Sequence, residues 1–274
     1  MSIRIDGKAL ADEILTGLKQ RVAALPVRPI LAVIQIGENP SSHSYIRQKE
    51  KVARLVGIGI KQFKFPARVS FQTVAEKITQ LNEDPAITGV IIQRPLPAHL
   101  SSHSFISAVA AKKDVDGFHE KSPFIPPISQ AITHILSVIL QTKSLRMALR
   151  NKKIVLVGRG ETAGKPIGET LSKLNIPVIQ VNSVTRNKEE FYKEADIIIS
   201  CVGKRGAVKG AQVKPGVMLI GVGIERADEK LVGDYDEGDI KDKASFYTPT
   251  PGGTGPLNIA YLLSNLVSAA EKST

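Results

Sequence analysis

Apolar segments of strand length alternate with amphipathic helical segments along the chain. Ile30 to Ile36, Gly89 to Ile92 and Lys153 to Val157 are nearly continuous apolar runs. Between the first two, residues 71–82 carry apolar side chains three or four positions apart, as on one face of a helix. Strands that alternate with helices predict parallel sheets covered on both faces, with ligands bound outside the carboxyl ends of the strands. We therefore expect an α/β protein whose functional residues follow its strands.

The charge and composition narrow the class of protein without identifying the partner. A formal net charge of +11 admits nucleic acid or an anionic small molecule. The lysines are spread along the whole chain, aromatic residues make up only 5%, and no basic tail stands out, so we expect no nucleic acid. No apolar run is long enough to span a membrane, and Met1 to Gln20 lacks the apolar core of a signal peptide. Cys201 is the single cysteine and cannot form an intrachain disulfide, so a cytoplasmic location is expected.

The first candidate site lies in the helix predicted after Ile36. Serines that follow Pro40 are suited to begin this helix, and Tyr45 and Lys49 stand four positions apart on one of its faces. A solvent-exposed face with extended lysines would have the same spacing. Gln93, however, ends another parallel strand, and residues after parallel strands share one rim of the sheet. The second observation favours a ligand site that contains Lys49 and Gln93.

The segment Lys113-Asp114-Val115-Asp116-Gly117 is a second candidate. Its two carboxylates bracket a valine and point apart if the segment is extended. A turn formed by the Asp-Gly pair explains the same residues, and both interpretations stay open. His119 is expected to be a hydrogen-bonded loop histidine rather than a catalyst.

A strand, a group of glycines and a helix follow one another from Lys153. Gly158, Gly160 and Gly164 have the spacing G-x-G-x-x-x-G, one residue longer than the standard dinucleotide fingerprint. Backbone amides and the helix dipole would face a pyrophosphate there. The next strand ends at residues 182–186, which offer hydroxyls, an amide and an arginine where an NAD site commonly has an acid. With Arg159 in the loop, these residues suit a 2′-phosphate, so NADP is expected rather than NAD, although an ordinary polar loop is the alternative.

Prolines bracket the glycines of residues 248–256, so this loop is constrained and its glycines allow close approach to a ligand. With this loop the chain resembles the bifunctional methylenetetrahydrofolate dehydrogenase/methenyltetrahydrofolate cyclohydrolase family nearly from end to end. The segments that carry the resemblance are Ile5-Asp6-Gly7-Lys8, Ser44-Tyr45 with Lys49, Gln93-Arg94-Pro95-Leu96-Pro97, Lys113 to Gly117, and Pro251-Gly252-Gly253-Thr254-Gly255-Pro256.

The resemblance implies two α/β domains across a cleft, the second a Rossmann-like dinucleotide-binding domain. The catalytic, folate-binding domain would span residues 1–125, with the terminal helix 257–274 packed back onto it. The NAD(P)-binding domain would span residues 126–256, which begins at the proline-rich junction near Phe124. Implied too are NADP-dependent oxidation of 5,10-methylenetetrahydrofolate, hydrolysis of the methenyl product to 10-formyltetrahydrofolate, a role in one-carbon metabolism and purine biosynthesis, and a homodimer.

The resemblance also assigns roles to single residues. Lys49 would be the catalytic lysine, Gln93 its hydrogen-bond partner, Tyr45 the ring that packs against the folate, and Asp116 the residue that holds the pterin. The loop residues Pro251, Gly252 and Gly253 would also contact the folate, and no metal is implied. The residues implied for NADP are Gly158, Arg159, Gly160, Gly164, Ser183, Thr185, Gly203, Gly223 and Ile224.

Several positions depart from the family's pattern. Pro126-Pro127-Ile128-Ser129 stands where Pro-Cys-Thr-Pro is usual, Ala131 replaces a glycine, Arg94 an apolar residue, Gly160 a serine, Asn182 a histidine, Gly221 an aspartate and Asn258 a threonine. These changes leave two alternatives open: retention of one activity, with the cyclohydrolase favoured, or a non-catalytic regulator that binds folate or nucleotide. The presence of Lys49 together with Gln93 argues against a regulator, which has no need of the pair.

Overall fold

The computed structural model describes residues 2–227 and 230–272. It divides into two compact units. One, the three-stranded unit, consists of Asp12–Pro127 and Ile259–Thr274. The other, the six-stranded unit, consists of Met1–Ala11 and Ile128–Asn258.

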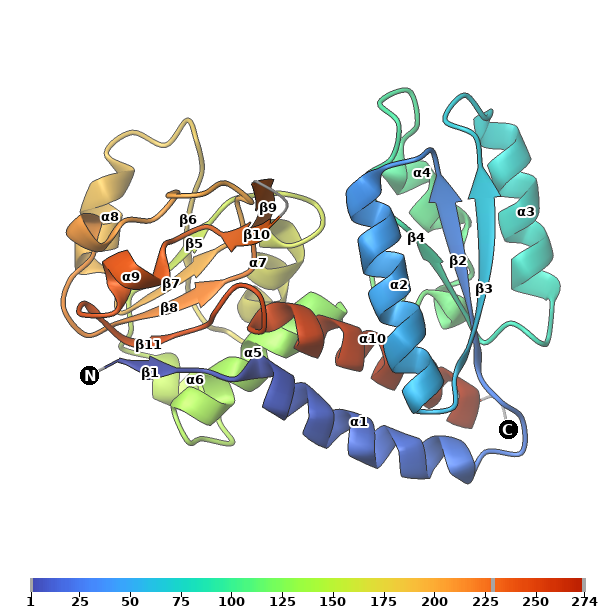
Figure 1. Ribbon diagram of the computed structural model, residues 1–274, viewed down its shortest axis with the longest axis horizontal. Helices are drawn as coiled ribbons and strands as arrows, with labels where there is room; N and C mark the ends of the chain where they lie inside the picture. The colour runs from blue at the N-terminus through green and yellow to red at the C-terminus, as the bar shows by residue number, and fades with distance from the viewer. Residues whose placement is uncertain (1, 228–229, 273–274) are drawn as a thin grey trace. The chain divides into compact units, whose positions relative to one another are not determined.

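The three-stranded unit is built on a parallel sheet with strand order β3-β2-β4 (Figure 1). Strand β2 (Ile30–Ile36) lies in the middle, between β3 (Gly59–Phe65) and β4 (Gly89–Ile92). The register pairs Ile34 with Phe63 on one side and with Ile92 on the other. The connecting helices are α2 (Pro40–Leu55), α3 (Phe71–Glu83), α4 (Ser102–Ala108) and the short η1 (Ala111–Lys113).

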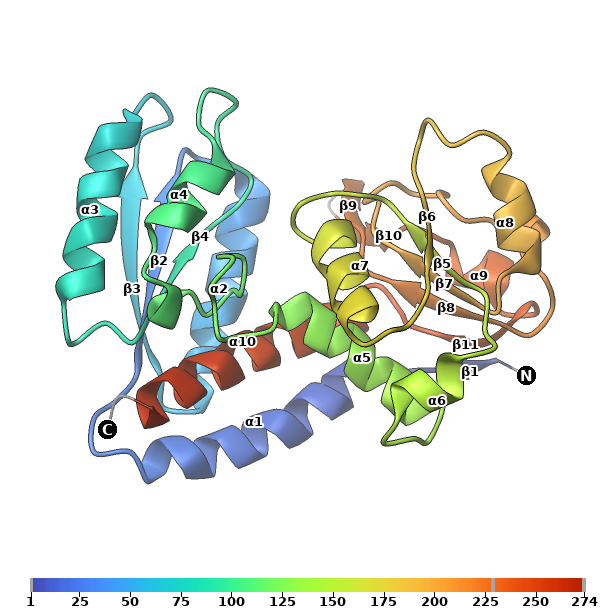
Figure 2. The same cartoon turned by 180° about the vertical axis from the view of Figure 1, so that it is seen from behind.

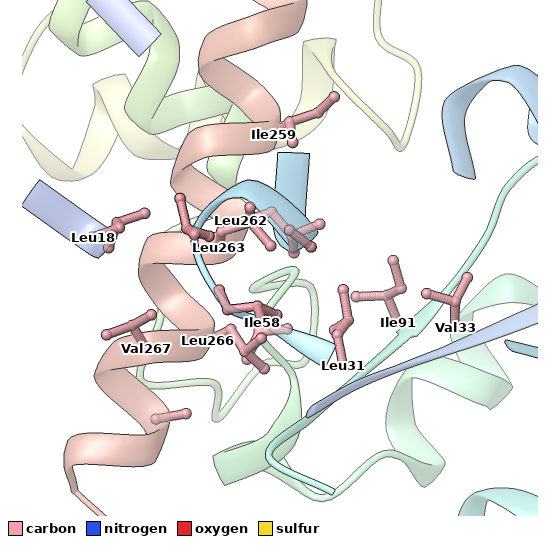
Figure 3. Close-up of a cluster of buried hydrophobic side chains, with 14 of the residues drawn as sticks. Leu18, Leu31, Val33, Ile58, Ile91, Ile259, Leu262, Leu263, Leu266 and Val267 are labelled. Carbon is pink, nitrogen blue, oxygen red and sulfur yellow. The ribbon is translucent and has the colours of Figure 1, made fainter. Parts of the chain in front are cut away.

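Both faces of this sheet are buried, which explains why β2 is apolar throughout. Successive side chains of a strand point to opposite faces. Ala32 and Ile34 pack with α3 and with Phe105 of α4, whereas Leu31 and Val33 pack on the other face. That second cluster includes Leu18 of α1 (Gly7–Ala23), Ile46 and Ala53 of α2, and Leu262, Leu263, Leu266 and Val267 of α10 (Thr254–Glu271) (Figure 3). Asn265 of α10 also donates hydrogen bonds to the carbonyl oxygens of Val115 (2.9 Å) and Ile125 (3.0 Å).

The six-stranded unit is a parallel sheet with strand order β1-β11-β8-β7-β5-β6. The strands are β1 (Ile3–Arg4), β5 (Ile154–Val157), β6 (Ile179–Val181), β7 (Ile197–Ser200), β8 (Val217–Gly221) and β11 (Ala244–Tyr247). After β5 the chain forms β6 on one side and then returns to form β7 on the other. The loops after β5 and β7 therefore meet where the strand order reverses, which is where α/β sheets bind ligands.

Helices and a hairpin complete the six-stranded unit. Figure 2 shows α7 (Gly164–Lys173) and α8 (Lys188–Glu194) around this sheet. The other elements are α5 (Pro127–Ile139), α6 (Leu145–Leu149), η2 (Gly210–Gln212), α9 (Glu237–Ile240) and the antiparallel pair β9 (Ile224–Ala227) and β10 (Lys230–Gly233).

The predicted α/β class with parallel sheets is confirmed. The units differ from the expected ranges at the amino terminus, because β1 pairs with β11 and joins residues 1–11 to the six-stranded unit rather than to residues 12–127. Pairing between residues about 240 positions apart leaves no local signal in the sequence. Among residues 2–227 and 230–272, no helix is long and apolar enough to cross a membrane.

Candidate active and cofactor sites

The amine of Lys49 is held at the carboxyl rim of the three-stranded sheet. Its Nζ donates a 3.0 Å hydrogen bond to Oε1 of Gln93, and only 8% of Lys49 is exposed. Gln93 follows β4 directly, where its backbone N–H donates to the carbonyl oxygen of Ile34. The side chains that were expected at one rim are therefore in contact, and the interpretation of Lys49 as part of a solvent-exposed face is wrong.

Burial and charge act against each other at Lys49 and Asp116. Burial lowers the pKa of the Lys49 ammonium, and the nearby Asp116 carboxylate partly opposes that change. Burial likewise raises the pKa of Asp116, which Lys49 and Arg94 partly reverse. Lys49 therefore releases its proton more readily than an exposed lysine does. An amine with a lowered pKa can accept and return a proton during a reaction more readily than an exposed lysine can.

Tyr45 stands one helical turn before Lys49 and is partly buried. Desolvation raises the pKa of its phenol, so the hydroxyl remains protonated and the ring presents an uncharged face. Tyr45, Lys49, Gln93 and Asp116 are called the lysine site below.

The two aspartates beside Val115 have different surroundings. Asp114 is buried, accepts a 2.7 Å hydrogen bond from the backbone N–H of His119, and accepts another from the Ser122 hydroxyl at its own carbonyl oxygen. Burial raises the pKa of Asp114 to about 6. The backbone N–H of Gly117 donates to the Asp114 carbonyl oxygen, so this segment is also the turn that the alternative interpretation expected. Asp114 thus shapes the turn, and Asp116 is the carboxylate that interacts with Lys49.

The loop between β5 and α7, Gly158 to Gly164, is called the glycine loop. Gly158 has φ +106°, a conformation that favours glycine, and its backbone N–H donates to the carbonyl oxygen of Val181. A Cβ at Gly164 would overlap the carbonyl oxygen of Gly158, whereas nothing lies within 4 Å of a Cβ at Gly160. The loop therefore needs glycine at its two ends and has open space at its middle. Its close packing leads the backbone into the first turn of α7, a geometry suited to a pyrophosphate.

Arg159 and the end of β6 lie on one side of the glycine loop. One guanidinium nitrogen of Arg159 donates to the carbonyl oxygen of Gln180 at 3.3 Å. Thr185 closes a turn by accepting from the backbone N–H of Asn182 (2.9 Å) and donating to its side chain, while Ser183 is exposed.

A depression of about 560 Å³ lies beside this region, lined by Arg159, Lys165, Gly168, Glu169, Ser172, Lys173 and Gln180. Its lining has three cations and one carboxylate, which favours an anionic group.

Asp234 organises the loop after β7 and was not identified from the sequence. It is fully buried and accepts from the hydroxyl of Ser200 (2.7 Å) and from the backbone N–H groups of Val202 and Lys204 (2.9 Å each). Gly223 packs directly on the Asp234 carboxylate, and a Cβ at Gly203 would lie 3.2 Å from the Ile224 carbonyl oxygen. Gly203, Gly223 and Ile224 therefore form one loop cluster around Asp234. Its members are far apart in the chain, so no motif could have revealed it.

The loop Pro251 to Gly253 follows Thr248, whose hydroxyl and carbonyl oxygen are both hydrogen-bonded. The hydroxyl of Tyr235 donates to the Thr248 carbonyl oxygen at 2.6 Å, and the backbone N–H of Gly221 donates to the Thr248 hydroxyl at 2.8 Å. Gly253 is buried, and Gly7 of α1 packs against its carbonyl oxygen so closely that no Cβ would fit. The loop is therefore constrained, as its prolines predicted. Within residues 2–227 and 230–272, no group of three or more His, Cys, Asp or Glu side chains could hold a metal ion.

Comparison with family models covers almost the whole chain. Residues 5–116 match the catalytic domain of tetrahydrofolate dehydrogenase/cyclohydrolase, and residues 130–274 match its NAD(P)-binding domain. The chain belongs to the tetrahydrofolate dehydrogenase/cyclohydrolase family. The resemblance stated from the motifs is thereby confirmed.

Individual members of the family are similar over their full length. The bifunctional protein FolD of Bordetella bronchiseptica is 38% identical over 276 residues, which cover 98% of each chain. The crystal structure of the bifunctional FolD enzyme of Campylobacter jejuni has a TM-score of 0.92 and 30% identity, with 100% of both chains covered. The FolD enzyme of Trypanosoma brucei, solved with NADP cofactor and an inhibitor, has a TM-score of 0.89 and 28% identity over 99% of this chain and 98% of that one.

Proposed function

We propose that this member of the tetrahydrofolate dehydrogenase/cyclohydrolase family catalyses both reactions. It oxidises 5,10-methylenetetrahydrofolate to the methenyl cation with NADP, and it hydrolyses that cation to 10-formyltetrahydrofolate. The observation that carries the proposal is the buried Lys49 amine, bonded to Gln93 and interacting with Asp116, in a chain that matches bifunctional relatives over their full length. That full-length match favours two activities over one.

In the lysine site the residues divide the work by their chemistry. Asp116 accepts hydrogen bonds from the N–H groups of the pterin, and the ring of Tyr45 packs against the folate. Lys49, whose pKa burial lowers, takes one proton from the attacking water and returns it to N5 as the bond from N5 to the methenyl carbon breaks, while the second proton of the water is released. Gln93 fixes the direction of the Lys49 amine through its 3.0 Å hydrogen bond. Pro251, Gly252 and Gly253 are assigned to folate binding as well.

The six-stranded unit fits a dinucleotide. Backbone N–H groups of the glycine loop would hold the pyrophosphate at the start of α7, and Gly158, Gly160 and Gly164 would let the backbone approach it closely. Arg159 and Ser183 would bind the 2′-phosphate, with Thr185 closing the turn that carries Ser183, since residues 182–186 contain no acid. Gly203, Gly223 and Ile224 line the nicotinamide end. When bound, NADP supplies the acceptor for the hydride that leaves the methylene carbon.

Three coarser features belong to the same proposal. The three-stranded unit, which holds most of residues 1–125 and the terminal helix, acts as the catalytic, folate-binding domain, and residues 126–256 act as the NADP-binding domain. The enzyme works as a homodimer in the cytoplasm. Size-exclusion chromatography with light scattering tests the dimer directly, since a mass near 30 kDa instead of twice that value would contradict it.

A single assay tests the two activities. Purified protein is mixed with NADP and methylenetetrahydrofolate, and the absorbance of NADPH and of the methenyl chromophore is followed. Growth of the methenyl signal followed by its decay above the uncatalysed rate is expected. Decay of added methenyltetrahydrofolate without any NADP reduction would leave only the cyclohydrolase, and neither signal would leave a binding protein.

A further inference from the structure

Arg94 places a permanent positive charge next to the lysine site. It follows Gln93 in the chain, and its carbonyl oxygen accepts hydrogen bonds from the Gln93 amide (2.9 Å) and the Ser42 hydroxyl (3.3 Å). The backbone on which the Arg94 side chain stands is therefore fixed by residues of the same rim.

The Arg94 side chain is directed at the segment that carries Asp116. Its guanidinium carbon lies 4.4 Å from the centre of the Phe118 ring, a cation–π contact two residues beyond Asp116. Arg94 also interacts electrostatically with the Asp116 carboxylate, alongside Lys49. Unlike Lys49, a guanidinium stays charged whether or not it is buried. The site therefore keeps this positive charge even when Lys49 is neutral.

The two folates of the proposed reactions differ in charge at the reacting carbon. When a hydride leaves 5,10-methylenetetrahydrofolate with its electron pair, the folate gains one positive charge. When water then adds to the methenyl cation and one proton is released, that charge is lost. A fixed cation nearby raises the energy of the methenyl folate relative to the folates that precede and follow it.

We infer that Arg94 is a specificity-determining residue that disfavours the methenyl cation against the methylene and formyl folates, which lack its positive charge, and so biases the enzyme toward hydrolysis. The inference rests on the proposed function. Its kinetic consequence has two directions. In hydrolysis, the folate loses its positive charge on the way to the transition state, so Arg94 destabilises the bound methenyl folate more than the transition state. In oxidation, the positive charge develops in the transition state, so Arg94 raises the energy of that transition state.

The test compares Arg94→Gln, which removes the charge, with Arg94→Lys, which keeps it. Arg94→Gln is expected to lower both KM and kcat for methenyltetrahydrofolate, by about three- to tenfold, and to raise dehydrogenase kcat/KM by a similar factor. Arg94→Lys keeps a positive charge at this partly buried position, so it should stay closer to the wild type than Arg94→Gln does, although it loses the flat guanidinium contact with Phe118. Arg47→Gln, which removes an exposed charge from the same helix as Lys49, is the matched control and should change neither activity.

Three other results would overturn the inference or the proposed function. A rise in KM for both folates by the same factor would overturn the inference, because Arg94 would then bind a carboxylate shared by both or support the Phe118 segment. Equal behaviour of Arg94→Lys and Arg94→Gln would also overturn it, since charge would not be the cause. A wild-type protein without either activity would overturn the proposed function, and the inference with it.

Discussion

The lysine site and the glycine loop are built in opposite ways. The lysine site uses side chains. A buried amine and a carboxylate affect each other's pKa, and an amide accepts a hydrogen bond from the amine. The glycine loop uses backbone: side chains are excluded at Gly158 and Gly164 so that main-chain groups can approach a ligand. Substitutions should therefore act on chemistry in the first region and on shape in the second. Four predictions, from the largest expected effect to the smallest, test this contrast.

Lys49→Met should reduce cyclohydrolase activity by about 10²–10⁴-fold, the usual contribution of a positioned acid or base. Dehydrogenase activity should persist in part, because hydride transfer needs no proton from Lys49. Methionine keeps the length and apolar stem of lysine, so the free energy of unfolding should change little. Initial rates of both reactions and a urea titration measure these three quantities.

Lys51→Met is the matched control, because Lys51 is exposed on the same helix and should have wild-type activity. Hydrolysis of methenyltetrahydrofolate by Lys49→Met at the wild-type rate would remove Lys49 from the mechanism. Because burial lowers the pKa of Lys49, its amine should lose its proton at a pH below the ordinary lysine pKa of 10.5. The rate of hydrolysis by the wild type should therefore rise with pH below that value.

Gly164→Ala should weaken NADP binding about thirtyfold, since a Cβ there overlaps the Gly158 carbonyl and forcing it in costs about 2 kcal/mol. Gly160→Ala is the control within the same loop, because nothing lies within 4 Å of its Cβ. Isothermal titration with NADP distinguishes the two variants. Equal affinities of the two variants for NADP would mean that the glycine loop can accommodate a side chain at position 164. The statement that this loop depends on the exclusion of side chains would then be wrong.

The lysine site was largely predictable because its signals are local. Tyr45 and Lys49 are related by helical spacing, and Gln93 by its place after a parallel strand. Asp234 was not predictable, because the Ser200, Val202 and Lys204 groups that it binds lie about 30 residues earlier in the chain. The short strand β1 was hidden for the same reason, since its partner β11 lies about 240 residues later in the chain.

One departure from the family's pattern acquires a physical reason in the structure. Gly221 stands where an aspartate is usual, and a Cβ there would lie 3.1 Å from the hydroxyl oxygen of Tyr235. That hydroxyl donates to the Thr248 carbonyl oxygen at 2.6 Å and fills the space beside Gly221. Glycine at position 221 therefore leaves the room that the Tyr235 side chain occupies. Nothing in the structure explains Gly160, whose surroundings would accept a serine.

Asp116→Asn should weaken folate binding about tenfold and leave NADP binding nearly unchanged. A carboxylate accepts two hydrogen bonds from the pterin, each strengthened by its charge, whereas the amide offers one acceptor and an unwanted donor. Binding of each ligand to the inactive Lys49→Met background can be measured by fluorescence without turnover. An equal loss for both ligands would instead identify Asp116 as a structural part of its turn.

Arg159→Ala should have the smallest effect, narrowing the preference for NADP over NAD about three- to tenfold. Arg159 is exposed and bonds to the Gln180 carbonyl at 3.3 Å, so it contributes a charge-assisted contact to a 2′-phosphate without shaping the loop. Affinity for NAD, which lacks that phosphate, should therefore stay within about twofold. Titration of both cofactors against the wild type, Arg159→Ala and Arg186→Ala separates the two arginines near this end of β6. If Arg186→Ala narrows the preference more, the 2′-phosphate is bound from the residues after β6 rather than from the glycine loop. If Arg159→Ala weakens both cofactors equally, this side chain supports the backbone, and the glycine loop depends on a side chain after all.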